Sequence, residues 1–347
     1  LELFPQDYLL SGKENAMFSY RNILIINEAL NKLALMGSRP YSIDNYISNL
    51  KFFAKIENNY YNHVGQAPVP ALRIFKACKE YNMTNDSSVQ EPSASTYMPD
   101  EIKVYKKKGE KELTAHIFNS RKESQTSSNP AFTFFHPGGW STGEPLWGYD
   151  LCRHYASKGM VAISFQYRLS SIGGFSPVDA LEDVKSAIRW IRKNSNELNI
   201  DPEKVMGGAI SAGAHLATCA ATLDGYNDPE DDLSIGAVPD ALALQSACLN
   251  TVIVDEFVSL LQGRDKPENL SPFHHLKAGM PPVCLIHGAA DDLVPFESVK
   301  EYAEKSVAMG NRCELHPFEG TDHFFGNVDG AEVFRLIDDF FVSLGYL

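Results

Sequence analysis

A serine flanked by small residues lies where a predicted strand gives way to a predicted helix. The segment VMGGAISAGAHLA, residues 205–217, ends a strand at Ser211 and continues as an alanine-rich helix. This context is typical of a nucleophile elbow, because small neighbours let the two backbones approach while the turn lifts the hydroxyl clear of the strand. The start of the helix would also point free N–H groups at an oxyanion formed beside the serine. The sequence therefore predicts nucleophilic catalysis at Ser211.

The elbow departs at one position from the usual G-x-S-x-G pattern. Ala209 stands where the first glycine is expected, whereas Gly213 occupies the second glycine position. Because Gly207 and Gly208 lie just upstream, we expect the additional methyl group to be accommodated. The alternative interpretation is a glycine-rich strand-to-helix turn without a catalytic serine.

A second glycine-rich turn lies upstream of the elbow. The segment FFHPGG ends a predicted strand and is followed by Trp140. Paired glycines can present backbone N–H groups to a substrate oxygen without side chains in the way. We therefore predict an oxyanion hole made by the N–H groups of Gly138, Gly139 and Ala212. An ordinary turn between a strand and a helix is the alternative.

A serine nucleophile needs a base, and the base needs a carboxylate that fixes its tautomer. HGAADDLVP follows a predicted strand and contains Asp291 and Asp292, and EGTDHFFGN later places His323 in a loop after another predicted strand. We expect His323 to be the base and Asp291 the orienting acid. Asp292 is the alternative acid, and Asp322 is interpreted as a solvated neighbour.

Several of the ten histidines compete for the role of the base. Only His323 combines a loop after a strand with a position downstream of the acid. The others considered lie in the glycine turn, in the helix after Ser211, at a strand end or in a loop: His136, His215, His287, His274 and His275.

The elements that would position these residues alternate along the chain. From Ala131 onward, short apolar strands are followed by amphipathic helices, which is the pattern of a mainly parallel sheet covered on both faces, an α/β fold. The expected strands are AFTFF, VAISFQY, KVMGG, ALALQSA, PPVCLIH and CELHPF, and the expected helices begin near Pro177, Ala212, Glu297 and Ala331. Before them, apolar residues on either side of KKKGEKE, between Ile102 and Phe118, predict a hairpin.

The first quarter of the chain has a different pattern. Residues 1–82 show helical periodicity, and residues 83–98 are rich in Ser, Thr, Asn and Pro, as connectors are. We therefore expect a helical N-terminal extension or cap with its linker over residues 1–97 and an α/β domain over residues 98–347. The N-terminal helices are also a candidate surface for homo-oligomerisation.

Charge and composition exclude some partners. A net charge of −13 would repel a nucleic acid. No apolar run reaches the roughly 18 residues of a membrane span, so we expect a soluble protein without a transmembrane segment. The first residues lack the features of a signal peptide, but the chain begins with Leu, so the compartment stays open between the cytoplasm and a secreted or periplasmic location after loss of a leader.

No metal or organic cofactor is predicted. The six cysteines are scattered without a C-x-x-C pair, which favours small core residues over a zinc site or a disulfide framework. The acidic segment DPEDD, Asp228 to Asp232, lacks the alternating ligand spacing of a calcium loop and is interpreted as a solvated turn.

From about Glu101 to the C-terminus, the chain resembles the α/β-hydrolase superfamily. Within it, the chain is similar to the acetyl esterase/lipase group related to hormone-sensitive lipase and to bacterial carbohydrate esterases such as acetyl-xylan and feruloyl esterases. The collinear segments that carry the resemblance are HPGGW, QYRL, DALEDVKSAIRWIRKN, DPEKVMGGAISAGAHLA, SPFHHLKAGMPPVCLIHGAADDLVP and GNRCELHPFEGTDHFF. HPGGW departs from the commoner HGGGW.

The resemblance implies an α/β-hydrolase fold with Ser211 as nucleophile, His323 as base and Asp291 as acid. Asp291 is preferred to Asp292 because it fits the pattern HGxxDxxVP. The implied reaction is hydrolysis of carboxylic esters through an acyl-enzyme.

The expected substrates are short-chain acyl esters or carbohydrate esters of acetyl or feruloyl groups. Trp140, Trp147 and Tyr149 are candidate substrate contacts, although large aromatic residues near a loop often pack a core. The alternatives are a lipase-like carboxylesterase or peptidase of the same fold, and a binding protein of this fold that has lost catalysis.

Overall fold

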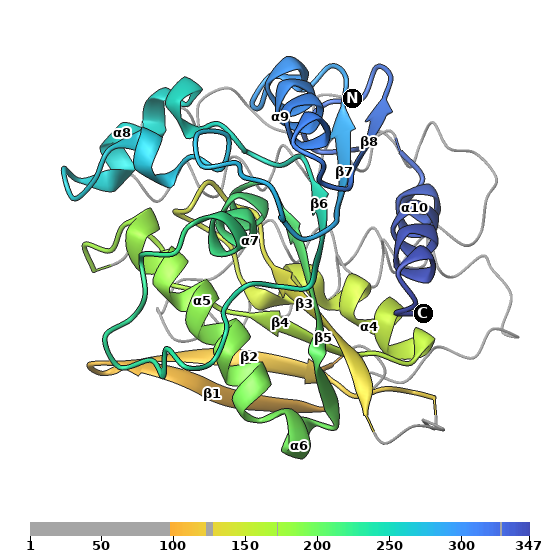
Figure 1. Ribbon diagram of the computed structural model, residues 1–347. Helices are drawn as coiled ribbons and strands as arrows, with labels where there is room; N and C mark the ends of the chain where they lie inside the picture. Colours follow the sequence, from red (N-terminus) through yellow and green to blue (C-terminus); the bar gives the residue numbers. More distant parts are fainter. Residues whose placement is uncertain (1–97, 123–127, 172, 327) are drawn as a thin grey trace, which may run out of the picture. The chain divides into compact units, whose positions relative to one another are not determined.

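The computed structural model describes residues 98–122, 128–171, 173–326 and 328–347 (Figure 1). The expected N-terminal helices and nearly all of the connector lie outside these residues, and the domain division at residues 97 and 98 stays a prediction. The strands are β1 (Glu101–Lys108), β2 (Lys111–Phe118), β3 (Asn129–Phe135), β4 (Val161–Phe165), β5 (Ile200–Ile210), β6 (Ala241–Gln245), β7 (Val283–Gly288) and β8 (Cys313–Phe318). The α-helices are α4 (Tyr149–Lys158), α5 (Pro177–Lys193), α6 (Ser195–Leu198), α7 (Ala212–Thr222), α8 (Asp255–Leu261), α9 (Phe296–Ala308) and α10 (Gly330–Ser343). The short 3-10 helices are η3 (Pro145–Gly148), η4 (Thr251–Ile253) and η5 (Pro267–Leu270).

The described strands form one 8-stranded sheet in the order β1-β2-β4-β3-β5-β6-β7-β8. β2 pairs antiparallel with both β1 and β4, and every pairing from β4 across to β8 is parallel. The carboxyl ends of β3, β5, β6, β7 and β8 therefore meet along one edge, and the loops that leave this edge can bring distant residues together. This arrangement confirms the predicted α/β fold.

Alternating side chains of the buried strands point to opposite faces of the sheet, as the period of two requires. In β3, Phe132 and Phe134 pack with helices α4 and α10, whereas Ala131 and Phe135 pack on the other face with α5 and α7. Figure 1 shows α5 and α7 in front of the strands. Each fully buried phenylalanine contributes about 2 to 3 kcal/mol of transfer free energy, so both faces stabilise the platform that carries the loops.

Local signals explain where α5 begins. Ser176 caps α5 through a capping box with Asp179, and Pro177 occupies the first turn, where a missing N–H is harmless. The four predicted helix starts agree with the structure to within one residue. No helix was predicted for α4 or α8, although the buried residues of α4 recur at helical spacing: Tyr149, Cys152, Tyr155 and Ala156.

The acidic segment at residues 228–232 differs from its prediction. The side chain of Asp228 is buried and pairs with Lys106 at 2.8 Å and with Lys108 at 2.7 Å, so the interpretation of the whole segment as a solvated turn was wrong. The two ammonium groups come from β1, far away in sequence, which is why the segment alone gave no sign of them. Among the described residues, no group of three or more His, Cys, Asp and Glu side chains is arranged to hold a metal ion.

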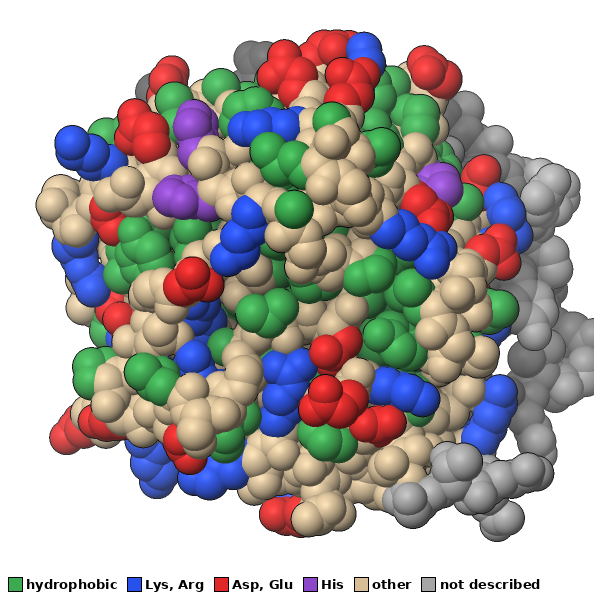
Figure 2. All heavy atoms as spheres, in the orientation of Figure 1, with side chains coloured by type: hydrophobic (Ala, Val, Ile, Leu, Met, Phe, Trp, Pro, Cys, Tyr) green, Lys and Arg blue, Asp and Glu red, His purple; other side chains and the backbone are tan. Residues whose placement is uncertain are grey.

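Acidic and basic side chains are mixed over the face of the molecule shown in Figure 2. That face carries no continuous basic surface that would suit a polyanion. In the described part of the chain, no helix is both long enough and apolar enough to cross a membrane.

Candidate active site

Ser211 lies at the carboxyl end of β5, immediately before α7. Its backbone is left-handed, with φ 53° and ψ −117°, and its N–H donates to the carbonyl oxygen of Gln245 in β6 at 2.9 Å. A left-handed serine is strained, and such strain persists where the surrounding structure enforces it, often at active sites. The strained turn is the geometry expected of a nucleophile elbow.

The glycine two residues after the serine is required by a close approach of two backbones. A Cβ atom on Gly213 would lie 2.1 Å from the carbonyl oxygen of Phe135 at the end of β3. Ala209, the departure from the usual pattern, is buried in β5 between Phe135 and Leu244 on the neighbouring strands. Its methyl group is therefore part of the packed sheet, as expected.

Three predicted residues form one hydrogen-bonded chain. The Ser211 hydroxyl donates to Nε2 of His323 at 3.0 Å, and Nδ1–H of His323 donates to Oδ2 of Asp291 at 2.8 Å. His323 is 8% exposed and Asp291 is 7% exposed, so little water competes for these bonds. The alternative acid, Asp292, is exposed and lies outside the chain of hydrogen bonds, and Asp322 is exposed as predicted.

Asp291 accepts additional hydrogen bonds that the sequence did not reveal. The backbone N–H groups of Leu293 and Val294 donate to Oδ1 at 3.0 and 2.8 Å, and Nε2 of His287 lies 3.1 Å from Oδ2. Burial alone would raise the pKa of Asp291, but the bonds from His287, His323 and Val294 outweigh it and hold the pKa well below its usual range. The Asp291 carboxylate is therefore ionised at moderate pH. The signal for His287 was its place as the first residue of HGxxDxxVP.

The loop that carries His323 leaves β8 and crosses the end of β7. At the crossing, a Cβ atom on Gly288 would lie 2.3 Å from the carbonyl oxygen of Thr321, so only glycine permits this approach. The N–H of Ala290 donates to the same carbonyl at 3.0 Å. This contact brings the imidazole from the end of the sheet toward Ser211.

The three amides predicted to bind an oxyanion lie in two elements. Gly138 and Gly139 belong to the loop after β3, and Ala212 opens α7, where a first-turn N–H has no intrahelical acceptor. Within the described chain, none of these three N–H groups donates to another protein atom. The loop is supported by Tyr167, whose hydroxyl donates to the His136 carbonyl at 2.8 Å. These N–H groups are thus free to donate to a substrate oxygen.

Trp140, a predicted substrate contact, packs in the core. It is 5% exposed, its ring packs against Phe257, and its Nε1–H donates to Nδ1 of His215 at 3.0 Å. His215 therefore carries its proton on Nε2 and donates it to the carbonyl of Leu270 at 2.6 Å. Burial lowers the pKa of His215 to about 4, so this imidazole is neutral and is engaged on both nitrogens.

The other two predicted substrate contacts, Tyr149 and Trp147, differ in burial. Tyr149 is buried, and its hydroxyl is 2.5 Å from Nδ1 of His116. Trp147 is 44% exposed, with its ring 6.2 Å from that of His136. Of the three aromatic residues, Trp147 alone presents a ring to solvent.

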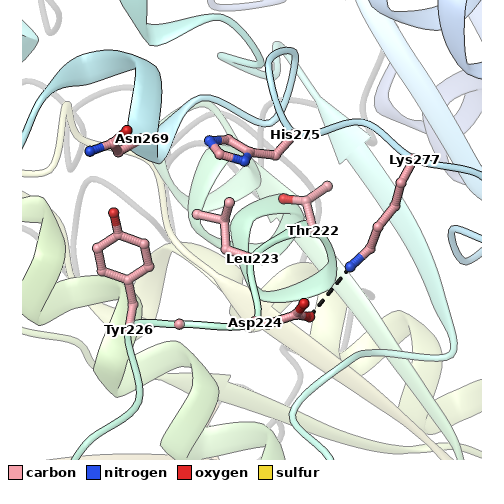
Figure 3. A pocket seen from close by; sticks show the side chains of 8 residues that line it. Thr222, Leu223, Asp224, Tyr226, Asn269, His275 and Lys277 are labelled. Atoms are coloured by element: carbon pink, nitrogen blue, oxygen red, sulfur yellow. Dashed lines mark hydrogen bonds and ion pairs between the residues drawn. The ribbon is translucent and has the colours of Figure 1, made fainter.

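A cavity of about 380 Å³ lies at the far end of α7 (Figure 3). Figure 3 shows Tyr226, His275 and Lys277 around it, with Lys277 paired to Asp224 at 3.3 Å. Thr222, the last residue of α7, lines it, whereas Ser211 precedes the first residue of that helix. A helix of 11 residues is about 16 Å long, so this cavity is remote from the serine.

Solved structures that are similar to this chain include esterases. A structure of Thermogutta terrifontis esterase 2 phosphonylated by sarin is 35% identical, with a TM-score of 0.69 and coverage of 75% of this chain and 99% of that chain. The propionate-bound structure of the same esterase is also 35% identical, with a TM-score of 0.68, and covers 75% and 98%.

More distant relatives are also named as esterases. Esterase LipC of Mycobacterium tuberculosis is 29% identical over an alignment of 233 residues that covers 61% of this chain and 57% of LipC. A probable isoprenylcysteine alpha-carbonyl methylesterase of Arabidopsis thaliana is 24% identical over an alignment of 230 residues that covers 58% of this chain and 46% of the methylesterase. The chain thus spans about half the length of the curated relatives it matches.

The family model named BD-FAE matches residues 117–305, which is more than half of the chain. The matched range includes Ser211 and Asp291, and the solved esterase structures extend the likeness over most of the remaining fold. The sheet, the strained serine and these matches agree, and the chain belongs to the BD-FAE family of esterases with the α/β-hydrolase fold.

Proposed function

We propose that the protein hydrolyses carboxylic esters through an acyl-enzyme, with Ser211 as nucleophile, His323 as base and Asp291 as orienting acid. The observation that carries this proposal is the hydrogen-bonded chain from the Ser211 hydroxyl through the imidazole to the carboxylate. Asp291 accepts the Nδ1 proton, so the lone pair of Nε2 faces the hydroxyl that must lose its proton.

In the first half-reaction, the Ser211 oxygen attacks the ester carbonyl carbon while its proton moves to Nε2 of His323. The negative charge that develops on the carbonyl oxygen is stabilised by the N–H groups of Gly138, Gly139 and Ala212. Each such donor typically contributes about 3 to 4 kcal/mol in the transition state. The tetrahedral intermediate then expels the alcohol, which takes the proton from His323, and the acyl group remains on Ser211.

In the second half-reaction, water attacks the acyl carbon and gives a proton to His323. The intermediate collapses with release of the carboxylic acid, and the Ser211 oxygen recovers its proton from the imidazole. The ionised Asp291 stabilises the imidazolium in both halves. Atoms and charges balance without any other reactant than ester and water.

The proposed substrates are esters of short acyl groups. The propionate-bound structure of the Thermogutta esterase supports a small acyl group, since that chain is matched over nearly its whole length. Carbohydrate esters bearing acetyl or feruloyl groups are the second candidate, favoured by the exposed ring of Trp147, which is suited to stacking on a sugar or an aryl acid.

A fluorophosphonate probe tests the proposed nucleophile. The wild-type chain should be labelled at Ser211, and Ser211→Ala should lose both labelling and ester hydrolysis. Labelling of the Ser211→Ala variant at the wild-type rate would overturn the assignment. A wild-type chain that stays unlabelled and inactive on esters would favour the binding protein without catalysis.

A series of p-nitrophenyl esters of rising chain length tests the proposed acyl group. We expect kcat/KM to be highest for acetyl to butyryl esters and to decline for longer chains. Acetylated sugars and feruloyl esters, compared with simple esters of the same acyl group, test the second candidate. A preference for long acyl chains would favour the lipase-like alternative.

A further inference from the structure

Ser246 lies at the carboxyl end of β6, between the strands that carry the nucleophile and the acid. It directly follows Gln245, whose carbonyl oxygen accepts the N–H of Ser211 at 2.9 Å. The N–H of Ser246 in turn donates to the carbonyl of Ile286 in β7, also at 2.9 Å. The end of β6 is therefore hydrogen bonded to both neighbouring strands, and the backbone of Ser246 has a fixed place beside the site.

The Ser246 hydroxyl extends this connection to the base. Its Oγ donates to the backbone carbonyl of His323 at 2.9 Å, and the Ser246 side chain is fully buried. In the sheet, β6 is separated by β7 from β8, the strand that leads to the His323 loop. The bond therefore joins the His323 loop to β6, a strand near the centre of the sheet. It is made to the backbone of the same residue whose Nε2 is hydrogen bonded to Ser211.

The backbone of Ser246 is left-handed, with φ 49°. Among the described residues, the non-glycine positions with positive φ include Ser211 at 53° and Phe325 at 57°, two residues after His323. A non-glycine residue in this region costs about 1 to 2 kcal/mol. Glycine would adopt this backbone without strain, but it has no hydroxyl to offer His323.

We propose that Ser246 is a positioning residue for the base: its buried hydroxyl fixes the His323 backbone so that Nε2 faces Ser211. This inference rests on the proposed function of His323. Neither the covalent step nor substrate contact involves Ser246. Loss of the Ser246 hydroxyl reduces the fraction of molecules in which Nε2 of His323 faces Ser211. This loss reduces kcat much more than it changes KM.

Two substitutions separate the hydroxyl from the backbone strain. Ser246→Ala removes the hydroxyl and keeps a strained backbone, whereas Ser246→Gly removes the hydroxyl and relieves the strain. We expect both variants to lower kcat by about ten- to hundredfold, since small displacements of catalytic groups have effects of that size, and to leave KM within about twofold. The rate of fluorophosphonate labelling should fall by the same factor as kcat.

Ser164 provides a matched control. It is also fully buried, and its Oγ donates to the Pro145 carbonyl at 2.7 Å, but neither residue contacts the hydrogen-bonded chain of the site. Ser164→Ala should lower the melting temperature about as much as Ser246→Ala while kcat per folded molecule stays at the wild-type value.

The outcomes distinguish this proposal from the proposed function. The positioning role would be overturned by a wild-type kcat in Ser246→Gly. It would also be overturned by equal losses of kcat in the Ser246→Ala and Ser164→Ala variants. In either case, an inactive Ser211→Ala variant would still support Ser211 as the nucleophile. Retained hydrolysis in Ser211→Ala would instead overturn the proposed function. Loss of kcat in both Ser246 variants, with an active Ser164→Ala control, supports the positioning role.

Discussion

Nε1 of Trp140 and Nδ1 of His215 are 3.0 Å apart and joined by a hydrogen bond inside the core. Trp140 directly follows the two glycines of the loop after β3, and His215 lies one turn along α7 from Ser211. Because Gly138 and Gly139 come from the loop and Ala212 from the helix, this bond ties together the two elements that hold the proposed oxyanion donors. A relative shift of loop and helix would move those donors apart.

Trp140→Phe should therefore weaken catalysis without emptying the core. The ring still packs on Phe257, but Nδ1 of His215 is left buried without a donor, at a cost of about 1 to 3 kcal/mol. We expect kcat to fall by about tenfold, with KM little changed. Steady-state kinetics on a short-chain ester measures this. Trp190→Phe, which changes a half-buried indole in α5, is the control and should keep the wild-type kcat. A similar loss of kcat in this control would contradict the proposed link between the loop and the helix.

Asp291→Asn should leave the fold intact and nearly abolish turnover. An amide can offer an N–H to His323 and so select the wrong tautomer, an effect that lowers kcat on the order of 10⁴-fold in serine hydrolases with this arrangement. Asp292→Asn, one residue further along and exposed, should hydrolyse esters at a normal rate. The reverse result, with Asp292→Asn inactive, would move the orienting role to the alternative acid.

Gly213→Ala should destabilise the protein strongly. The new methyl group would lie 2.1 Å from the Phe135 carbonyl, so strand β3 and helix α7 must separate. We expect a loss of about 3 kcal/mol or more in the free energy of unfolding, measured by urea denaturation. At Gly225 a Cβ atom meets nothing within 4 Å, and Gly225→Ala is expected to change stability by less than about 0.5 kcal/mol. Equal effects in the two variants would be inconsistent with the close approach.

The buried Asp228 carboxylate predicts a specific dependence of stability on pH. Burial raises its pKa, but hydrogen bonds from Lys106 and Lys108 outweigh this and lower the pKa far below the ordinary 3.8. Because the unfolded chain binds the proton more readily, the stabilisation is complete well above pH 3.8 and is lost as pH falls below that value toward the folded pKa.

Asp228→Asn should therefore cost about 3 to 5 kcal/mol of unfolding free energy at pH 7 and less at pH 3. Urea denaturation at both pH values measures the difference. Glu110→Gln, at the exposed tip of the β1–β2 hairpin, should show no such dependence. A cost for Asp228→Asn that is equal at both pH values would argue against the ion pairs.

The parallel strands and the turn at Ser211 could be predicted from local sequence. Short apolar runs separated by turns predicted the parallel strands, and small residues around Ser211 predicted the strained elbow, because both depend on neighbours within a few positions. The hydrogen bond from Ser246 to His323 joins residues far apart in the chain, and it exists only because β6 and the loop after β8 meet at one edge.

Burial was harder to predict than position. Trp140, Trp147 and Tyr149 are close in sequence and similar in chemistry, yet two are buried and one is exposed. What separates them is packing against Phe257 in one case and a bond to His116 in another, and both partners come from other elements. The ion pairs of Asp228 were missed for the same reason.

The loop that carries His323, the proposed base, follows β8, which lies at one edge of the described sheet. The side chains of β8 are mostly half-buried, whereas those of β7 are fully buried. The edge of a sheet has fewer contacts to break, so it is a natural place for local opening. If β8 detaches, His323 leaves with it while Ser211 stays on the intact centre. Ester turnover would then be lost at a lower temperature than the global fold. The catalytic rate would therefore report this local opening before circular dichroism reports global unfolding.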